Sequence, residues 1–299
     1  MKTKLIAFAT AVLCTVAISL GLAGKVYTVS AMDYGRTYNY YLYSSCRSGT
    51  YTLYGEDIVS AVSTRSGLVD DRVPDKENIA VVWTSTGTGF IVDDHVIATN
   101  AHCVYNDDGL VRAMRVKIYN EDCSQVLDIV DPVEVHIPNA YILNRESNKE
   151  LARQYDYALL YVTEDISQYG MLPLGVPTDD FMSSGATVYS SGFPQATSTN
   201  PYANSNTRLV SSGKIMDFRG GKDAALFERK IVFNNYSSEG NSGGPVYVST
   251  TCLGKTYKTA IGILHGGSKN KDKSYGVRVT SDLLMFYYNN PNLGAYEWY

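Results

Sequence analysis

The sequence predicts an all-β protein in which two six-stranded antiparallel β-barrels pack together and a short C-terminal helix follows. Short apolar runs separated by turn residues recur along the chain, and this spacing is typical of barrels and sandwiches. The composition agrees, because 25 of the 299 residues are tyrosine and only 19% are charged. Aromatic and β-branched residues favour strands over helices.

The apolar runs fall into two series of six. The first series comprises residues 80–83, 89–92, 96–98, 115–119, 133–137 and 157–162, and the second comprises residues 186–189, 209–215, 230–233, 245–248, 259–264 and 275–279. They predict one barrel over about 73–170 and another over about 171–299. After the last run, Thr280 or Ser281 can cap a helix that ends before Pro291.

The first 31 residues have the features of a secretory signal. Lys2 and Lys4 precede an apolar run, and small residues allow cleavage after Ala23 or Ala31. An uncleaved anchor is the alternative, because the run approaches the length that spans a bilayer. Cleavage predicts an extracellular protein with no stable membrane association, although attachment to the cell surface stays possible.

Residues 32–72 are rich in tyrosine and lack periodicity. We interpret this segment as a propeptide, which would make the chain a zymogen. The alternative is an N-terminal extension on the surface of the domain. The folded domain is then expected to span residues 73–299.

Four cysteines remain once Cys14 leaves with the signal: Cys46, Cys103, Cys123 and Cys252. An even number in an exported chain permits disulfide bonds. A local bridge between Cys103 and Cys123 is one possibility, although spacing alone does not give the connectivity. No Cys-x-x-Cys or His-x-x-x-His spacing occurs, so we expect no metal.

A net charge of -4 excludes the large basic face that nucleic-acid binding requires. We therefore expect no nucleic-acid or other polyanionic partner. A monomer is a separate expectation.

The clearest motif is Gly-Asn-Ser-Gly-Gly-Pro at residues 240–245. A serine hydroxyl becomes an effective nucleophile when it is exposed, has a base beside it, and faces N–H groups that stabilise the developing oxyanion. Flanking glycines permit a sharp turn, so that the N–H groups of Gly240 and Ser242 can point at one oxygen. Ser242 is therefore a candidate nucleophile, with a plain glycine-rich turn as the alternative.

A histidine and an aspartate precede this serine at strand ends. His102 lies in Thr-Asn-Ala-His-Cys after an apolar run, and its residue type suits general-base chemistry at neutral pH. Asp156 precedes the run at residues 157–162, and a buried carboxylate can orient an imidazole.

Together these motifs resemble the trypsin-like serine peptidases, and within them the secreted bacterial group that contains glutamyl endopeptidases and exfoliative toxins. The chain order His, Asp, Ser matches that fold. Further similarities are Asp-Asp-Arg-Val at 70–73, Gly-Thr-Gly-Phe at 87–90 and Ser-Gly-Phe-Pro at 191–194. The resemblance implies a chymotrypsin-like double barrel, a catalytic triad of His102, Asp156 and Ser242, and no cofactor.

Two departures from the family pattern bear on mechanism. Asn241 stands where trypsin has an aspartate that pairs with the new N-terminal amine, so that ion pair cannot form here. Activation by removal of residues up to about Arg72 is therefore a hypothesis. Glutamyl endopeptidases place a carboxylate-binding histidine where Leu264 stands, whereas His265 is one residue later. One step along a strand reverses the side-chain direction, so His265 should face the catalytic aspartate.

The resemblance also implies a substrate pocket, formed by Ser237, Leu264, Gly267, Gly276 and Arg278. An uncharged residue before the scissile bond is favoured by the two glycines. An acidic residue is the alternative, suggested by Arg278 and nearby lysines.

The predicted function is that of a secreted serine endopeptidase, whose partners would be protein or peptide substrates. One alternative is a binding or adhesion module that keeps the fold without the activity. Another is an esterase, since Gly-x-Ser-x-Gly is formally present, but that fold places its histidine last in chain order.

Overall fold

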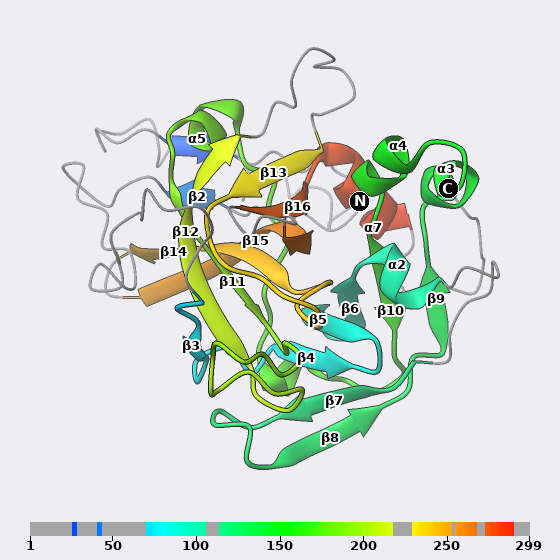
Figure 1. The fold of residues 1–299 in the computed structure, drawn as a ribbon. Helices are drawn as coiled ribbons and strands as arrows, with labels where there is room; N and C mark the ends of the chain where they lie inside the picture. Colours follow the sequence, from blue (N-terminus) through cyan, green and yellow to red (C-terminus); the bar gives the residue numbers. More distant parts are fainter. Residues whose placement is uncertain are drawn as a thin grey trace, which may run out of the picture.

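The apolar runs form two antiparallel sheets of seven strands that lie beside each other (Figure 1). A computed structural model describes residues 26–28, 41–43, 70–105, 114–217, 229–252, 255–267 and 273–289. The signal and most of the tyrosine-rich segment lie outside these residues. From that region the structure describes only β1 (Val26–Thr28) and β2 (Tyr41–Tyr43), which pair antiparallel.

The first sheet has the strand order β8-β7-β4-β5-β6-β10-β9. Its strands are β4 (Val81–Thr84), β5 (Gly87–Asp93), β6 (Val96–Thr99), β7 (Val116–Tyr119), β8 (Val126–Val130), β9 (Glu134–His136) and β10 (Ala158–Tyr161). Among the described residues the end strands β8 and β9 do not pair with each other. This half is therefore a half-barrel, where the sequence predicted a closed barrel of six strands.

The second sheet closes into a barrel. Its order is β11-β14-β15-β16-β13-β12-β3, and β11 pairs with β12 to join the ends of a six-stranded ring. The strands are β3 (Val73–Pro74), β11 (Thr187–Gly192), β12 (Leu209–Asp217), β13 (Lys230–Phe233), β14 (Pro245–Cys252), β15 (Lys255–Gly267) and β16 (Ser274–Arg278). Strand β3 adds to β12 on the outside of the ring. The all-β chymotrypsin-like architecture is confirmed.

Two clusters of buried apolar side chains stabilise the halves. The larger cluster fills the first sheet and continues into the second through residues such as Phe193, Tyr247 and Ile263. The smaller cluster fills the second barrel and includes Leu264. Because the larger core crosses between the halves, their packing fixes the geometry of any site at the junction.

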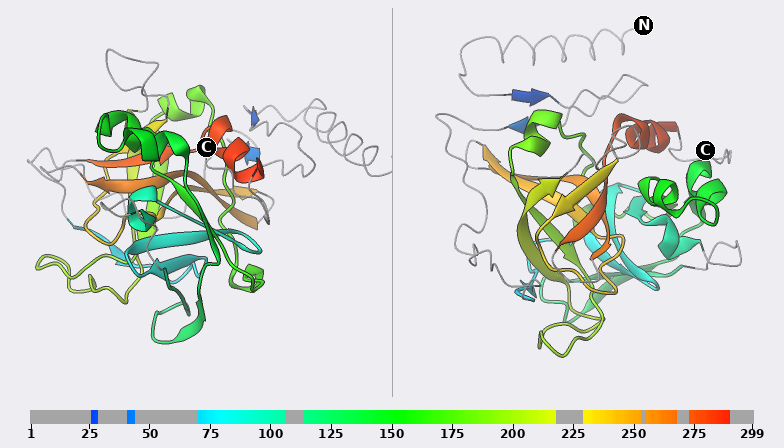
Figure 2. Two further views of the ribbon diagram at one scale, coloured as in Figure 1. Left: turned by 90° about the vertical axis from the view of Figure 1, so that its right-hand side faces the viewer. Right: turned by 45° about the horizontal axis from the view of Figure 1, so that its top comes forward.

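Short helices connect the strands. They are α2 (Ala101–Val104), α3 (Asn139–Asn144), α4 (Lys149–Gln154), the 3-10 helix η2 (Ser167–Tyr169), α5 (Asp179–Ser183) and α7 (Ser281–Asn289). The predicted final helix is confirmed as α7, which appears in red in Figure 2. Its Phe286 ring packs edge-on against Tyr157 of the first half, with centroids 5.3 Å apart. In the described part of the chain, no helix is long and apolar enough to cross a membrane.

The cysteines Cys103 and Cys123 are both free thiols, so the bridge considered between them is not formed. Cys103 is buried, with its Sγ 3.8 Å from the carbonyl oxygen of Ser242. Cys123 accepts the N–H of Arg208 at 3.4 Å. Their different neighbours show why nearness in sequence did not bring the sulfurs together. Cys46 and the side chain of Cys252 lie outside the described residues.

Candidate active site

The pairing of β6 with β10 brings His102 and Asp156 together. Thr99 lies opposite Ala158 in this antiparallel pair, so the residues that follow β6 meet those that precede β10. His102 lies in α2, directly after β6. The Asn100 side chain secures the junction by donating to the carbonyl of Asp156 at 2.6 Å.

His102 is bonded twice to the carboxylate of Asp156. Its Nδ1 lies 2.7 Å from Oδ2, and its backbone N–H donates to Oδ1 at 2.8 Å. Asp156 is fully buried, whereas 36% of the His102 side chain is exposed. The Nδ1 contact fixes the ring orientation and leaves Nε2 on the side away from the carboxylate.

Each member of this pair shifts the pKa of the other. Burial lowers the pKa of His102, but the charge and hydrogen bond of Asp156 outweigh burial and hold it well above the usual value. Burial raises the pKa of Asp156, and the attraction and hydrogen bond of His102, together with His265, reverse that effect and leave the pKa far below its usual value. The aspartate is therefore ionised at neutral pH.

His265 is a second imidazole on the same carboxylate. Its Nδ1 contacts Oδ2 of Asp156, and its ring meets that of His102 edge-on at 5.1 Å between centroids. The expectation that His265 faces the aspartate agrees with this geometry. The three side chains place ligand atoms within 4.8 Å of one another. Both imidazoles use Nδ1 on one oxygen, however, and this arrangement orients rings rather than encloses an ion.

Ser242 lies in the loop between β13 and β14, at the junction of the two halves. Its hydroxyl donates to the carbonyl of His265 at 3.0 Å. The loop is held against β15, since Gly243 N donates to the Leu264 carbonyl at 2.9 Å and Leu264 N donates to that of Gly244 at 2.8 Å.

Two backbone N–H groups in this loop are left available to an incoming oxygen. The carbonyl of Glu239 accepts Gln195 N at 2.8 Å, and the carbonyl of Asn241 accepts Gly244 N at 3.0 Å. A trans peptide directs its N–H opposite to its carbonyl, so those of Gly240 and Ser242 point away from these partners. Neither bonds to another described residue. Gly240 has a φ of 89°, a conformation that glycine adopts without strain.

Thr88 of β5 connects the half-barrel to residues 234–244, the loop between β13 and β14. We call this segment the nucleophile loop, because Ser242 is the candidate nucleophile. Its N–H donates to the carbonyl of Ser242 at 2.8 Å, and its hydroxyl donates to that of Gly240 at 2.7 Å. The same hydroxyl accepts Phe193 N at 2.9 Å. These three bonds join the segments around Gly87 and Phe193 that the sequence motifs singled out, and they fix the loop relative to His102.

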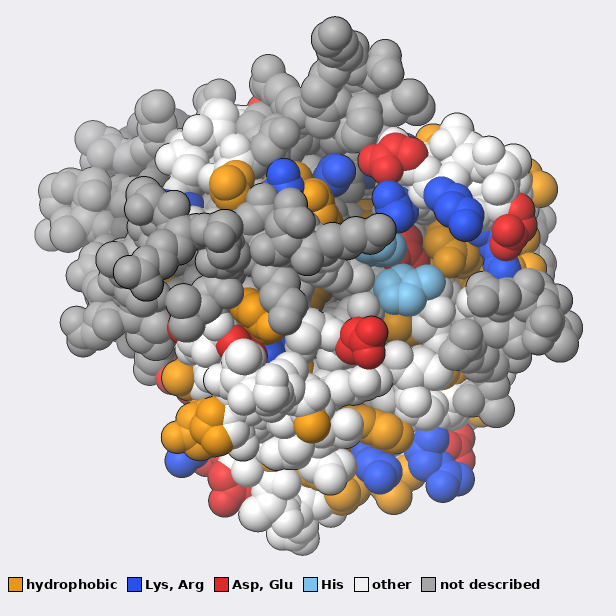
Figure 3. Space-filling view, viewed as in Figure 1, with side chains coloured by type: hydrophobic (Ala, Val, Ile, Leu, Met, Phe, Trp, Pro, Cys, Tyr) orange, Lys and Arg blue, Asp and Glu red, His pale blue; other side chains and the backbone are white. Residues whose placement is uncertain are grey.

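A cavity of about 310 Å³ opens beside His265. Figure 3 shows histidine side chains on this face with Lys and Arg side chains gathered beside them. Its lining residues are Glu150, Arg153, Gln154, Arg229, Lys230, His265, Gly267, Tyr275 and Gly276. Only Gly267 and Gly276 of the predicted pocket residues belong to this set.

The other predicted pocket residues lie elsewhere. Leu264 is fully buried in the smaller core. Arg278 directs its guanidinium to the carbonyl of Pro177 at 2.7 Å and to Asp179 at 2.9 Å. Ser237 lies behind Gly267, and its hydroxyl bonds that of Ser274 at 2.8 Å.

Sequence reasoning missed the roles of Arg72 and of Thr88. Arg72 bonds to Asn241 across 169 positions of sequence, and Thr88 bonds to Gly240 across 152. The motif around Thr88 was a signal that this segment lies near the site, but the motif did not indicate which atom it contacts.

Comparison with known proteins agrees with this geometry. A structure titled "Structure of Glu endopeptidase in complex with MPD" superposes with a TM-score of 0.57 at 19% identity, over 77% of this chain and 100% of the other. At that identity the likeness shows the fold alone. The family model described as Trypsin matches residues 72–285. The chain therefore belongs to the trypsin family and is a serine endopeptidase.

Proposed function

We propose that the chain hydrolyses peptide bonds through an acyl-enzyme on Ser242, with His102 as general base and Asp156 as the group that orients it. The observation that carries this proposal is the pair of hydrogen bonds that His102 makes to the buried carboxylate of Asp156, one through Nδ1 and one through its backbone N–H. It holds the imidazole in one orientation and stabilises the cation that forms during turnover. Protein and peptide substrates follow from this chemistry.

In the first step the Ser242 oxygen attacks the substrate carbonyl and its proton passes to Nε2 of His102. The N–H groups of Gly240 and Ser242 receive the resulting oxyanion. His102 then gives the proton to the leaving amine, which departs as the C–N bond breaks. Water, deprotonated by the same imidazole, then attacks the acyl carbon. The ester bond to the Ser242 oxygen breaks, His102 returns the proton to that oxygen, and the acid product leaves.

The serine hydroxyl must change partner before this chemistry begins. In the structure it donates to the carbonyl of His265 rather than to His102. A turn about its Cα–Cβ bond between staggered positions redirects the oxygen. We propose that substrate binding along β15 displaces the hydroxyl from this carbonyl.

The contacts around the cavity support an uncharged residue before the scissile bond. Its basic side chains already have acidic partners: Arg153 lies 3.2 Å and Lys230 3.7 Å from Glu150, and Arg229 contacts Asp282. Arg278 is turned toward Pro177 and Asp179. Behind Gly267 the buried, uncharged side chains of Ser237 and Ser274 bond to each other. An acidic preference stays the alternative.

Export with removal of the signal, and a monomeric state, remain part of the proposal. The apolar run before Ala23 and the small residues after it support export. N-terminal sequencing of protein recovered from the culture medium tests this part separately from activity.

A binding module without activity is the second candidate, favoured by the bond of the Ser242 hydroxyl to the His265 carbonyl. A fluorophosphonate probe distinguishes the two functions, because only an activated serine reacts with it. We expect labelling that Ser242→Ala abolishes and that Ser249→Ala, a change at a buried serine of β14, preserves. Wild-type protein that is folded but unlabelled would establish the binding module.

A peptide-library digest by the same proteins tests specificity. We expect cleavage after uncharged residues such as Leu, Phe or Tyr, absent with Ser242→Ala. Cleavage confined to sites after Glu or Asp would instead establish the acidic alternative.

A further inference from the structure

Arg72 is a buried arginine that joins the start of the domain to the nucleophile loop. Its Nη1 donates to Oδ1 of Asn241 at 2.6 Å and to Oγ of Ser238 at 2.9 Å. Only 3% of Arg72 is exposed, and Asn241 is equally buried. Since Asn241 directly precedes Ser242, this contact reaches the backbone that carries the nucleophile.

The guanidinium is held in place from its other side by Asp70. Nε and Nη2 donate to the two carboxylate oxygens at 2.7 Å each, and both side chains are 1% exposed. Bidentate pairs of this kind restrict the position of the guanidinium more than a single bond does. Asn200 extends the cluster by donating to Asp70 at 3.0 Å and to the Arg72 carbonyl at 2.9 Å.

The contact with Asn241 acts on the turn that forms the oxyanion site. Oδ1 of Asn241 also accepts Ser238 N at 3.2 Å, and Asn241 N donates to the Ser238 carbonyl at 3.1 Å. These bonds close residues 238–241 into one turn that contains Gly240. A displaced Asn241 side chain would therefore change the direction of the Gly240 N–H.

Charge balance explains why residue 241 is an amide. Arg72 and Asp70 neutralise each other in a buried cluster. An aspartate at 241 would add an uncompensated negative charge there, which burial makes unfavourable. A neutral asparagine accepts the same hydrogen bond without that charge.

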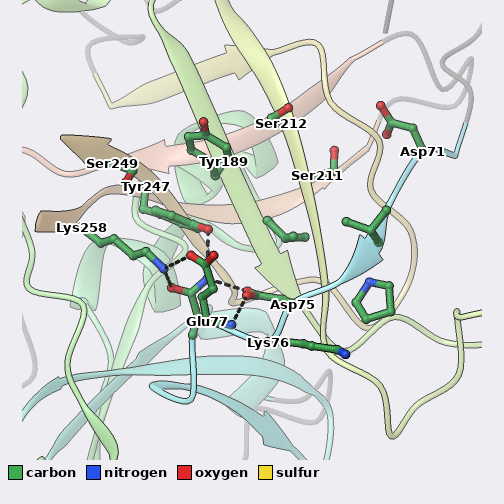
Figure 4. A pocket seen from close by; sticks show the side chains of 14 residues that line it. Asp71, Asp75, Lys76, Glu77, Tyr189, Ser211, Ser212, Tyr247, Ser249 and Lys258 are labelled. Atoms are coloured by element: carbon green, nitrogen blue, oxygen red, sulfur yellow. Dashed lines mark hydrogen bonds and ion pairs between the residues drawn. The ribbon is translucent and has the colours of Figure 1, made fainter. Parts of the chain in front are cut away.

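The residues after Arg72 are anchored as firmly. Strand β3 pairs with β12, and buried Asp75 accepts Ser191 Oγ at 2.5 Å and Asn78 Nδ2 at 2.6 Å. Figure 4 shows Asp75 in the wall of a second cavity on this side of the barrel. Residues 70–72 therefore pack with the folded domain, although the sequence placed them in the preceding segment.

We propose that Arg72 is a positioning residue that holds the nucleophile loop in its reactive form, so the active protein retains Asp70 and Arg72. The inference rests on the proposed function. It replaces the hypothesis of activation by cleavage up to Arg72, because that cleavage would remove the cation that binds Asn241.

The test compares labelling rates of full-length variants with a fluorophosphonate probe, well below their unfolding temperatures. Arg72→Gln should label about 10- to 100-fold more slowly, the range expected for loss of a charge-assisted bond. Arg208→Gln is the matched control, because Arg208 is fully buried but bonds to carbonyls of residues 75, 81, 120 and 121. It should lower the unfolding temperature without slowing the labelling of folded protein. An Arg72→Gln protein that labels at the wild-type rate overturns the proposal.

A charge exchange separates positioning from general stability. Asn241→Asp alone should label slowly, since it adds a buried negative charge. Combined with Asp70→Asn it restores neutrality and should recover most of the rate. If Arg72→Gln fails to fold, this pair still decides, because failure of the double variant to exceed the single one overturns the proposal.

N-terminal sequencing of probe-labelled wild-type protein tests the second part of the proposal, that the active protein retains Asp70 and Arg72. The labelled chain should begin at or before Asp70, and a labelled chain that begins after Arg72 overturns the inference. Wild-type protein that is not labelled at all would contradict the proposed function instead.

Discussion

His265 contacts through Nδ1 the carboxylate oxygen of Asp156 that also binds His102. Because both imidazoles share this oxygen, we propose that His265 supports the carboxylate of Asp156. Loss of His265 leaves the carboxylate with fewer donors in a fully buried place.

We therefore expect His265→Ala to lower kcat/KM about 10-fold, mainly through kcat, as the loss of one hydrogen bond to a charged group predicts. His265→Asn should restore much of the activity, because its amide N–H stands near the position of Nδ1. His95→Ala is the control, since His95 is bonded to the Glu164 carbonyl away from the site. Equal kcat values for His265→Ala and wild type would contradict a supporting role.

Activity should rise with pH through a midpoint above 6.5, the ordinary histidine value. In the proposed mechanism protonated His102 cannot accept the Ser242 proton, and Asp156 raises the pKa of His102. Labelling rates measured between pH 5 and pH 9, at roughly constant ionic strength, check this. A midpoint at or below 6.5 would show that the aspartate does not exert this effect.

Over the pH range in which activity rises, the contribution of this pair to stability should fall. The raised pKa of His102 contributes stability that is fully present below 6.5 and is lost as pH rises through the folded-state value. The lowered pKa of Asp156 contributes stability present above 3.8 and lost as pH falls through its folded-state value. The pair thus contributes fully between 3.8 and 6.5. The unfolding temperature of wild type should exceed that of Asp156→Asn by an amount that becomes smaller as pH rises above 6.5. A difference that stays constant with pH would contradict this linkage.

Thr88→Val should reduce activity, although Thr88 lies in strand β5 and is not a member of the proposed triad. The change keeps the side-chain shape but removes the hydroxyl bonds to Gly240 and Phe193. We expect a loss of about 1 to 3 kcal/mol in the free energy of unfolding and a labelling rate lower by roughly 10-fold in the folded protein. Thr88→Ser keeps the hydroxyl and should label near the wild-type rate. Similar rates for the valine and serine variants would exclude the hydroxyl as the cause.

Alkylation should distinguish the two thiols. Cys123 is partly exposed and Cys103 buried, and neither is bridged. Iodoacetamide should modify Cys123 in the folded protein and Cys103 only after unfolding, which peptide mass spectrometry can measure. Recovery of a peptide pair joined by Cys103 and Cys123 would instead support the disulfide.

Strand periodicity and chain order predicted much of this molecule because they are local properties. The runs became strands. Leu264 is buried and His265 is partly exposed, but regular alternation does not account for this, because residues 259–264 are all buried and the register shifts between Leu264 and Gly266. Helices α4 and α5 were missed, although Asn148 and Thr178 cap them by accepting Leu151 N and Phe181 N. The sequence shows that Asn148 and Thr178 are residue types that can cap a helix, but it does not show that a helix follows each of them.

The remaining features depend on partners distant in sequence. Nothing near Arg278 in the sequence indicates that its guanidinium bonds to Pro177 and Asp179, which precede it by 101 and 99 positions. The same is true of Arg72 and Asn241. Open ends of the first sheet were also unpredictable, because the number of runs does not determine whether the end strands pair.

The hydrogen bonds of Thr88 join the two halves of the molecule, so a substitution can inactivate the enzyme by disturbing the contact between the halves. His102 and Asp156 lie in segments that adjoin strands of the first sheet, and Ser242 lies in a loop between strands of the second. Their alignment therefore depends on how the two halves dock. A substitution that loosens this docking can silence the enzyme while each half keeps its strands. Circular dichroism, which reports secondary structure, would not detect such a change. An activity measurement would detect it, because activity requires the two halves to be correctly docked.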